Sequence, residues 1–291
     1  MKKVLHLWVL GGDLRQLHLA HQLAREGHQV HTYALEGTAV PASGLCPEPD
    51  LTALHQADAV ILPMPVSADG HTLFAPLSPV PVSLAQVLEA VTPSQFLYGG
   101  RLDESLMTQF HRKGCAIHDY YARKELTLSN CVPTAEGAIQ LAMERLPITI
   151  HASRVLVVGC GRLGKITAQR FSALGAEVTV AARRYEHQAW ANCHGFGAED
   201  SQKLAQRLSK YDLIINTVPA LLLGAEELSG LKPDCLVIDL ASKPGGVDFD
   251  AAQRLGLSVI HALALPGKVA PATAGAIIKE TICHMLDEHG F

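Results

Sequence analysis

Two stretches of the chain, residues 4–35 and 154–184, repeat the same order of sequence features. Each has an apolar run that suits a buried strand, then a glycine-rich turn, an amphipathic helix, a glycine and a second apolar run. This order is that of a β-α-β unit, in which a helix joins two parallel strands. Two such units predict an α/β fold with two doubly wound, Rossmann-like domains.

Further apolar runs supply strands for two separate parallel sheets. We expect three more strands in the first domain and three in the second, at 58–64, 95–100, 115–120, 212–219, 235–242 and 257–263. Because parallel sheets bind ligands beyond the carboxyl ends of their strands, two sheets that face each other predict one interdomain cleft.

The expected domain boundaries follow from the helices between these strands. Residues 1–130 form an N-terminal substrate domain, 131–148 a connecting helix, and 149–270 the nucleotide-binding domain. A helix at 271–291 is expected to pack back on the first domain, so that two helices cross between the domains. The proline-rich segment 63–81 is a candidate lid or dimer arm, and we expect a homo-oligomer.

The composition excludes several classes of protein. The 24 lysines and arginines and 28 acidic residues give a net charge of −4, whereas nucleic-acid binders usually carry a basic excess. No apolar run approaches the roughly 18 residues of a membrane span. The seven cysteines never form a C-x-x-C pair, which indicates reduced thiols in a cytoplasmic protein.

The run "VVGCGRLG" carries a G-x-G-x-x-G motif directly after an apolar strand and at the start of a helix. In dinucleotide-binding domains these glycines allow a tight turn, close approach of the backbone to the pyrophosphate, and close helix–strand packing. Arg162 can reach the pyrophosphate or lie in solvent. The motif predicts cofactor contacts by Gly159, Cys160, Gly161, Arg162, Leu163 and Gly164.

The end of the second strand of this domain, "VTVAARR", has no acidic residue. NAD-binding domains normally carry Asp or Glu there, for the ribose hydroxyls. Arginine instead suits the 2′-phosphate of NADP, through charge-assisted hydrogen bonds. We therefore predict NADP, bound by Ala182, Arg183 and Arg184, with Thr179 also lining the adenosine end and Tyr185 packing on the ring.

Two further strand ends complete the predicted nucleotide site. "INTVP" ends a strand with Asn216, Thr217, Val218 and Pro219, which we place beside the nicotinamide ribose. "DLASKPGG" follows the next strand, and places Asp239 and Ser242 near the nicotinamide.

The first domain carries a degraded version of the phosphate loop. Gln16 stands where the third glycine would be, so a second dinucleotide is not expected. Asp13 can cap the helix that follows. Arg15 lies in the first helical turn, where the helix dipole disfavours a cation unless an anion sits between them. We therefore assign Arg15 to a substrate carboxylate.

Four more residues are candidate catalytic residues: Lys243, Lys268, Thr134 and Glu136. The helix that begins at Pro271 has an all-small first turn, which suits either a bound anion or close helix packing. No metal site is expected, since His18 and His21 share a helical face without a third ligand, and we take both as solvated.

Together these motifs resemble those of the family of the dipicolinate synthase A subunit, nearly from end to end. The stretches that carry the resemblance are "GGDLRQL" (11–17), "VPTAEGAIQLA" (132–142), "VVGCGRLG" (157–164), "DLIINTVPA" (212–220), "IDLASKPGGVDF" (238–249) and "LPGKVAPATAGAII" (265–278). The resemblance implies an NADP-dependent enzyme of sporulation in the mother-cell cytoplasm. It would oxidise a dihydrodipicolinate to pyridine-2,6-dicarboxylate, together with the flavoprotein-like B subunit of dipicolinate synthase.

The resemblance gives the candidates roles and leaves two choices open. The two substrate carboxylates need anion sites, which Arg15, Lys268 or Lys243, and the helix start near Pro271 can provide. Asp13 or Glu136 can accept the proton. The substrate is either the dihydro compound or its hydroxylated tetrahydro precursor. The alternatives are a D-2-hydroxyacid dehydrogenase, although Pro266, Gly267 and Lys268 stand where its histidine would be expected, and a non-catalytic NADP-binding scaffold.

Overall fold

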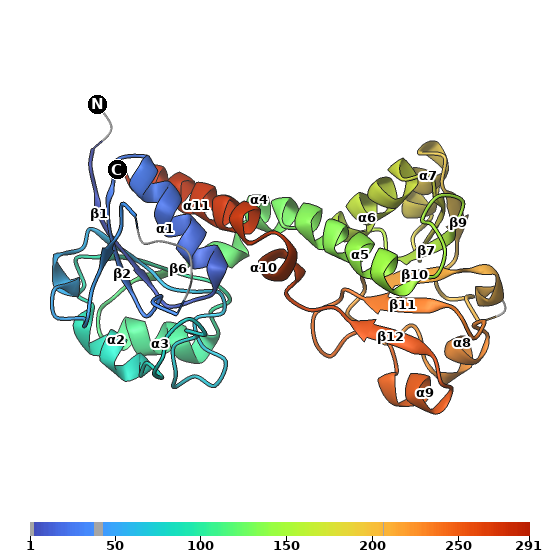
Figure 1. Cartoon of the computed structure of the whole chain (residues 1–291), viewed down its shortest axis with the longest axis horizontal. Coiled ribbons are helices and arrows are strands. Elements are labelled where there is room, and N and C mark those ends of the chain that lie inside the picture. The colour runs from blue at the N-terminus through green and yellow to red at the C-terminus, as the bar shows by residue number, and fades with distance from the viewer. Residues whose placement is uncertain (1–2, 38–42, 206) are drawn as a thin grey trace. The chain divides into compact units, whose positions relative to one another are not determined.

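The computed structural model describes residues 3–37, 43–205 and 207–291. The chain divides into two compact units, of which the first comprises Met1–Asn130 and Ala270–Phe291 and the second Cys131–Val269 (Figure 1). Each unit contains a parallel sheet with helices on both faces, which confirms the predicted α/β fold with two Rossmann-like domains.

The sheet of the first unit has the strand order of a doubly wound fold. Its six strands run parallel in the order β3 (Cys46–Pro47), β2 (Gln29–Tyr33), β1 (His6–Leu10), β4 (Ala59–Ile61), β5 (Phe96–Gly99) and β6 (Ile117–Asp119). The order reverses between β1 and β4, and the crevice at such a reversal is where open α/β sheets bind their ligands.

Alternate residues of these strands face two different helix layers, as the two-residue period of a strand requires. Leu7 and Val9 pack in a core with α1 (Leu14–Arg25) and α11 (Pro271–Glu288). Trp8 and Leu10 point to the other face, towards α2 (Leu84–Ala90) and α3 (Glu104–Arg112). The remaining helical segments of this unit are η1 (Leu54–Gln56), η2 (Tyr120–Ala122) and α4 (Lys124–Ser129).

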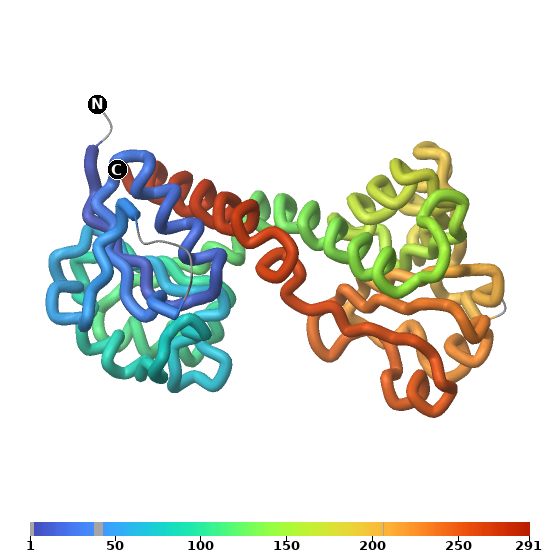
Figure 2. The backbone as a smooth tube through the Cα atoms, in the orientation of Figure 1, coloured from blue at the N-terminus to red at the C-terminus, as the bar shows by residue number. Residues whose placement is uncertain are grey.

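Both ends of the chain belong to the first unit. The ammonium group of Lys3 lies 4.8 Å from the centre of the Phe291 ring, and Figure 2 shows the start of the coloured tube near its C-terminal end. Helix α11 therefore returns to the unit in which the chain begins, and lies along α1.

The second unit repeats the same strand order. Its six parallel strands are β12 (Ser258–His261), β11 (Leu236–Asp239), β10 (Leu213–Asn216), β7 (Arg154–Val158), β8 (Glu177–Ala181) and β9 (Gly197–Glu199). The reversal here falls between β7 and β10. The glycine motif follows β7, at the ligand-binding edge of this sheet.

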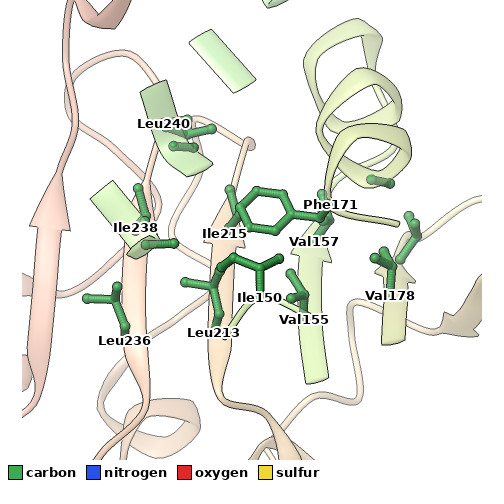
Figure 3. Packing of buried hydrophobic residues seen from close by; sticks show 14 of the residues in the cluster. Ile150, Val155, Val157, Phe171, Val178, Leu213, Ile215, Leu236, Ile238 and Leu240 are labelled. Atoms are coloured by element: carbon green, nitrogen blue, oxygen red, sulfur yellow. The ribbon is translucent and has the colours of Figure 1, made fainter. Parts of the chain in front are cut away.

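Two apolar cores also hold the second sheet. On one face, Val157, Ile215 and Ile238 pack beneath Phe171 of α6 (Arg162–Ala173), as Figure 3 shows, and α5 (Cys131–Arg145) covers the same face. The opposite core contains Val158 and Ile214. The other helical segments of this unit are α7 (Tyr185–Cys193), η3 (Leu208–Lys210), α8 (Ala225–Ser229), α9 (Phe249–Arg254) and α10 (Leu265–Val269).

Two strands were not predicted from the sequence, and both lie at sheet edges. Strand β3 is two residues long and ends in a proline, which lacks the N–H of a regular ladder. Strand β9 begins with Gly197 and has no apolar run, so periodicity gives no signal for it.

Candidate functional site

In the glycine loop after β7, other atoms of the chain pack closely against two of the three glycines and leave no room for a side chain there. Gly159 has φ +103, and a Cβ built there would lie 2.4 Å from Thr217 Oγ1. A Cβ on Gly164 would lie 2.2 Å from the carbonyl oxygen of Gly159. These glycines therefore allow the tight turn and the close packing of α6 on β7.

Gly161 differs, because no heavy atom lies within 4 Å of a Cβ built on it. It caps the N-terminus of the 12-residue helix α6 and has no side chain to bond the first-turn N–H groups. The backbone there faces open space, and a helix N-terminus carries a partial positive charge. This arrangement suits the pyrophosphate of a dinucleotide.

The other residues of the motif contribute their backbone more than their side chains. The Cys160 side chain is buried, its Sγ lies 3.9 Å from the carbonyl oxygen of His187, and burial raises the pKa of this thiol. Leu163 packs against the core beneath α6. Arg162 is exposed at the first position of the helix.

At the end of β8 the two arginines differ in their surroundings. Arg184 is exposed, and its Nη1 lies 3.2 Å from Glu186 Oε1. The guanidinium group of Arg183 is exposed and has no ion-pair partner in the described residues. Ala182 is buried, and Tyr185 is 86% exposed. Arg183 is therefore the better placed of the two to meet a phosphate.

Thr179 does not lie where we expected it. Its hydroxyl is hydrogen-bonded to Tyr211, and its side chain borders a cavity together with Arg154 and Gly197. These two residues begin β7 and β9, so the cavity lies towards the amino ends of the strands. The prediction that Thr179 lines the adenosine end was wrong, because position within a strand decides which edge a side chain reaches.

Asn216 and Asp239 form a fully buried pair at the ends of β10 and β11. The Asn216 amide donates to Asp239 Oδ1 at 2.8 Å and to the carbonyl oxygen of Val218 at 2.9 Å. Asp239 also accepts from the N–H groups of Ala241 (3.0 Å) and Gly246 (2.8 Å). The pair thus holds the loops after both strands in place, which favours a positioning role.

The residues that follow this pair are more accessible. Thr217 donates through Oγ1 to the carbonyl oxygen of Val158 at 2.9 Å, which ties the end of β10 to the glycine loop. Pro219 and Ser242 are exposed. Side chains beyond the Asn216–Asp239 pair can therefore meet a ligand at this edge.

The two lysines expected to bind substrate are both exposed, without an ion pair in the described residues. Lys243 lies in the loop that Asp239 holds. Lys268 lies within the short helix α10, where the sequence suggested only a loop before the last helix. Both cations are free to bind an anion.

The two candidates in α5 (Cys131–Arg145) differ in how open they are, since Glu136 is exposed. Glu136 forms an ion pair with Arg170 Nε of α6 at 3.6 Å. Arg170 lies in the last turn of α6, far along that helix from the glycine loop. Thr134 is half-buried in the first turn of α5. Because its partner Arg170 is at the far end of α6 from the glycine loop, Glu136 is the weaker of the two proton-acceptor candidates by its position, although it is open to solvent.

Asp13 and Arg15 bind each other in the first unit. Arg15 Nε and Nη2 lie 2.8 and 2.9 Å from the Asp13 carboxylate, and Nη2 also donates to the carbonyl oxygen of Met64 at 2.8 Å. Arg15 is 8% exposed. The anion that a cation in this helical turn requires is therefore Asp13, so the arginine needs no substrate carboxylate.

The degraded phosphate loop of the first unit is filled by the chain. A Cβ on Gly12 would lie 2.2 Å from Gln16 Cγ, and the N–H of Gly12 donates to the carbonyl oxygen of Phe74 at 2.7 Å. Gly12 is therefore needed by the chain's own packing in this turn.

The small residues of α11 serve helix packing. A Cβ on Gly275 would lie 2.6 Å from the carbonyl oxygen of Arg15 and 2.9 Å from His18 Cβ. His18 and His21 are half-buried, so they are less solvated than expected. In the described part of the chain, no group of three His, Cys, Asp or Glu side chains could hold a metal ion.

One residue near the end of β5 was not among the candidates predicted from the sequence. Arg101 follows this strand and has φ +57, a left-handed backbone that few non-glycine residues adopt. The dipeptide Gly99-Gly100 before it marks a turn, but the conformation itself leaves no trace in the sequence.

No helix among the described residues is long and apolar enough to cross a bilayer.

Two family models match the chain. Residues 6–121 match the N-terminal domain of the dipicolinate synthase A subunit. Residues 106–251 match the NAD-binding domain of D-isomer specific 2-hydroxyacid dehydrogenases. The second match includes the glycine loop and the strands around it.

One curated relative and two solved structures are similar over almost the whole chain. The dipicolinate synthase A subunit of Bacillus subtilis (strain 168) is 32% identical, and the alignment covers 98% of this chain and 96% of that protein. The crystal structure of the corresponding protein from Bacillus halodurans has a TM-score of 0.88 at 31% identity, over 98% of this chain and 99% of that one. That of dipicolinate synthase, A chain, from Bacillus subtilis has a TM-score of 0.87 at 31% identity, over 99% and 97%.

Proposed function

The chain belongs to the family of the dipicolinate synthase A subunit, and from this we propose that it oxidises a dihydrodipicolinate to pyridine-2,6-dicarboxylate with NADP. Its dehydrogenase-type domain makes it an oxidoreductase with a nicotinamide cofactor. The reaction removes one hydride and one proton from the substrate ring. Because the product is aromatic, the protein chiefly has to position the substrate and exclude water.

The observation that carries this proposal is the open backbone at Gly161, at the N-terminus of α6. The residues there fit a dinucleotide. Gly159 and Gly164 allow the tight turn, and Gly161 leaves room for the pyrophosphate. When bound, the nicotinamide supplies a hydride acceptor. Asn216 and Asp239 hold the loops at the edge where this ring would lie.

We assign the preference for NADP to Arg183. Its guanidinium group is unpaired in the described residues, and Ala181 and Ala182 offer no carboxylate to the ribose hydroxyls. A charge-assisted hydrogen bond contributes about 1.5–3 kcal/mol, which corresponds to at least tenfold in affinity. Arg184 contributes less to binding of the 2′-phosphate, because it already forms an ion pair with Glu186.

For the substrate, Lys243 and Lys268 of the second unit each offer a cation to a carboxylate. Asp13 is our candidate for the proton acceptor, since it lies at the carboxyl end of β1 and keeps 28% of its side chain exposed. Arg15 holds the Asp13 carboxylate in place. The working enzyme includes the flavoprotein-like B subunit and a homo-oligomer of this chain, in the mother cell of a sporulating bacterium.

The proposal is tested with the purified full chain, with and without the B subunit. Freshly generated dihydrodipicolinate is added with NADP or NAD, and the absorbance of the reduced cofactor is followed. We expect substrate-dependent reduction that is faster with NADP. Reduction by the B subunit in the absence of this chain would instead make this chain a scaffold.

A parallel assay with D-lactate and D-glycerate tests the dehydrogenase alternative. Dehydrogenases of that type need a histidine paired with an acid just before the last helix, whereas here Pro266, Gly267 and Lys268 occupy that region. We therefore expect no turnover of these acids.

A further inference from the structure

Three arginines follow strands at the carboxyl edge of the first sheet, and two of them are neutralised by acids. Arg15, after β1, is paired with Asp13. Arg123, after β6, donates to both carboxylate oxygens of Glu288 at 2.7 Å, and this contact raises the pKa of the arginine. Arg101, after β5, is exposed, and its guanidinium group has no hydrogen bond or ion pair with the described residues.

The backbone at Arg101 is fixed by its surroundings. Both oxygens of Asp119 accept N–H groups of this turn, Oδ1 from Arg101 at 3.1 Å and Oδ2 from Leu102 at 3.2 Å. The preceding Gly100 lies so close to the loop after β4 that a Cβ there would be 2.6 Å from Met64 Cβ. The backbone from which the Arg101 side chain extends is thus fixed before any ligand binds.

The conformation of Arg101 suggests that its side chain is needed there. At φ +57 a glycine would avoid the strain that any other side chain brings. Strained backbone held by its surroundings is characteristic of functional sites. The guanidinium carbon lies 5.9 Å from the centre of the Tyr121 ring, at the outer range of a cation–π contact, and the group remains open to solvent.

We propose that Arg101 binds one carboxylate of the substrate at the edge of the first sheet. This inference rests on the proposed function, and gives the first unit the anion site that the pairing of Arg15 removes. The planar guanidinium fork matches a carboxylate in two parallel hydrogen bonds, which a lysine cannot reproduce. Arg101 then also selects for diacids over monoacids.

Binding of the stable product gives a readout independent of turnover. The full chain with NADP is titrated by calorimetry with pyridine-2,6-dicarboxylate and with pyridine-2-carboxylate. We expect Arg101→Ala to weaken diacid binding by about 10- to 100-fold, the loss of a charge-assisted pair. The preference for the diacid should shrink with it, whichever carboxylate Arg101 holds, and Arg101→Lys should fall between. Arg112→Ala is the matched control, since Arg112 is an exposed arginine at the end of α3, before β6 begins.

A second variant separates binding from folding. Arg101→Gly relieves the backbone strain, so we expect a melting temperature equal to or above that of the wild type, together with the same loss of diacid binding. If the wild type binds the diacid and both Arg101→Ala and Arg101→Gly bind it equally well, the assignment of Arg101 is overturned but the proposed function is not. If the wild type binds neither the diacid nor dihydrodipicolinate, the proposed function falls as well.

Discussion

Asp13 and Arg15 are neighbours on one turn of chain, and the carboxylate of the first accepts from both Nε and Nη2 of the second at 2.8–2.9 Å. Asp13 also caps α1 by accepting the N–H of Arg15 at 3.0 Å. The pair therefore combines a helix cap with an ion pair whose cation is 8% exposed. Either residue alone would leave a charge poorly solvated.

This pairing predicts that Asp13→Asn lowers stability. The change leaves Arg15 buried without a counter-charge, and breaking a fully buried pair costs about 3–5 kcal/mol. Asp13 keeps 28% of its side chain exposed, so we expect a smaller loss, about 2–3 kcal/mol, in urea unfolding. Arg25→Ala, an exposed arginine at the other end of α1, serves as the control. Arg15→Ala with unchanged stability but a raised KM for the dicarboxylate would return Arg15 to the substrate site.

The glycine loop predicts opposite outcomes for two similar substitutions. Gly164→Ala places a methyl group 2.2 Å from a carbonyl oxygen of the same loop, so we expect a marked loss of stability. Gly161→Ala meets no protein atom within 4 Å, so the fold should keep its melting temperature. The methyl group would instead lie where the pyrophosphate approaches, and we expect at least about tenfold weaker NADPH binding by fluorescence titration. Equal NADPH affinity in Gly161→Ala and the wild type would contradict the assigned site.

The cofactor preference should respond to Arg183 more than to Arg184. Removing the unpaired guanidinium of Arg183 deletes a charge-assisted bond to the 2′-phosphate, so Arg183→Ala should raise KM for NADP about tenfold or more. KM for NAD should stay the same, since NAD lacks that phosphate. Arg184→Ala should have a smaller effect on KM for NADP, because Arg184 already forms an ion pair with Glu186. A parallel rise in both KM values for Arg183→Ala would argue against 2′-phosphate recognition.

The sequence predicted those parts of the molecule that depend on local pattern. The strands around Val157 and Ile215 are continuous apolar runs, and the turn between β7 and α6 requires glycine at fixed offsets, so both could be read directly. The missing acid at the end of β8 likewise needs no knowledge of the rest of the fold.

Contacts between distant segments could not be read in this way. Arg15 is bonded to the carbonyl oxygen of Met64, 49 residues further on, and the conformation of Arg101 depends on Asp119, 18 residues away. The small residues near Gly275 fitted a ligand or a helix equally well, until α1 was found against them. The role assigned to Arg15 therefore changed once its pairing with Asp13 was known, although the helix that carries it was predicted correctly.

His118 makes stability depend on pH in the mildly acidic range. Its ring packs against those of Tyr98 and His289, with centroids 5.9 and 4.7 Å away, and those two rings also contact each other. Burial, and then the neighbouring His289, lower the pKa of His118 below its ordinary value of 6.5. The unfolded chain therefore binds more protons than the folded chain just below pH 6.5, and stability falls as the pH drops through this window.

His118→Gln removes the titrating group, so the free energy of unfolding in urea should fall less between pH 7 and pH 5 than in the wild type. His111→Gln, on the exposed surface of α3, should keep the wild-type slope. Identical slopes for His118→Gln and the wild type would show that the folded protein takes up the proton on His118 without cost.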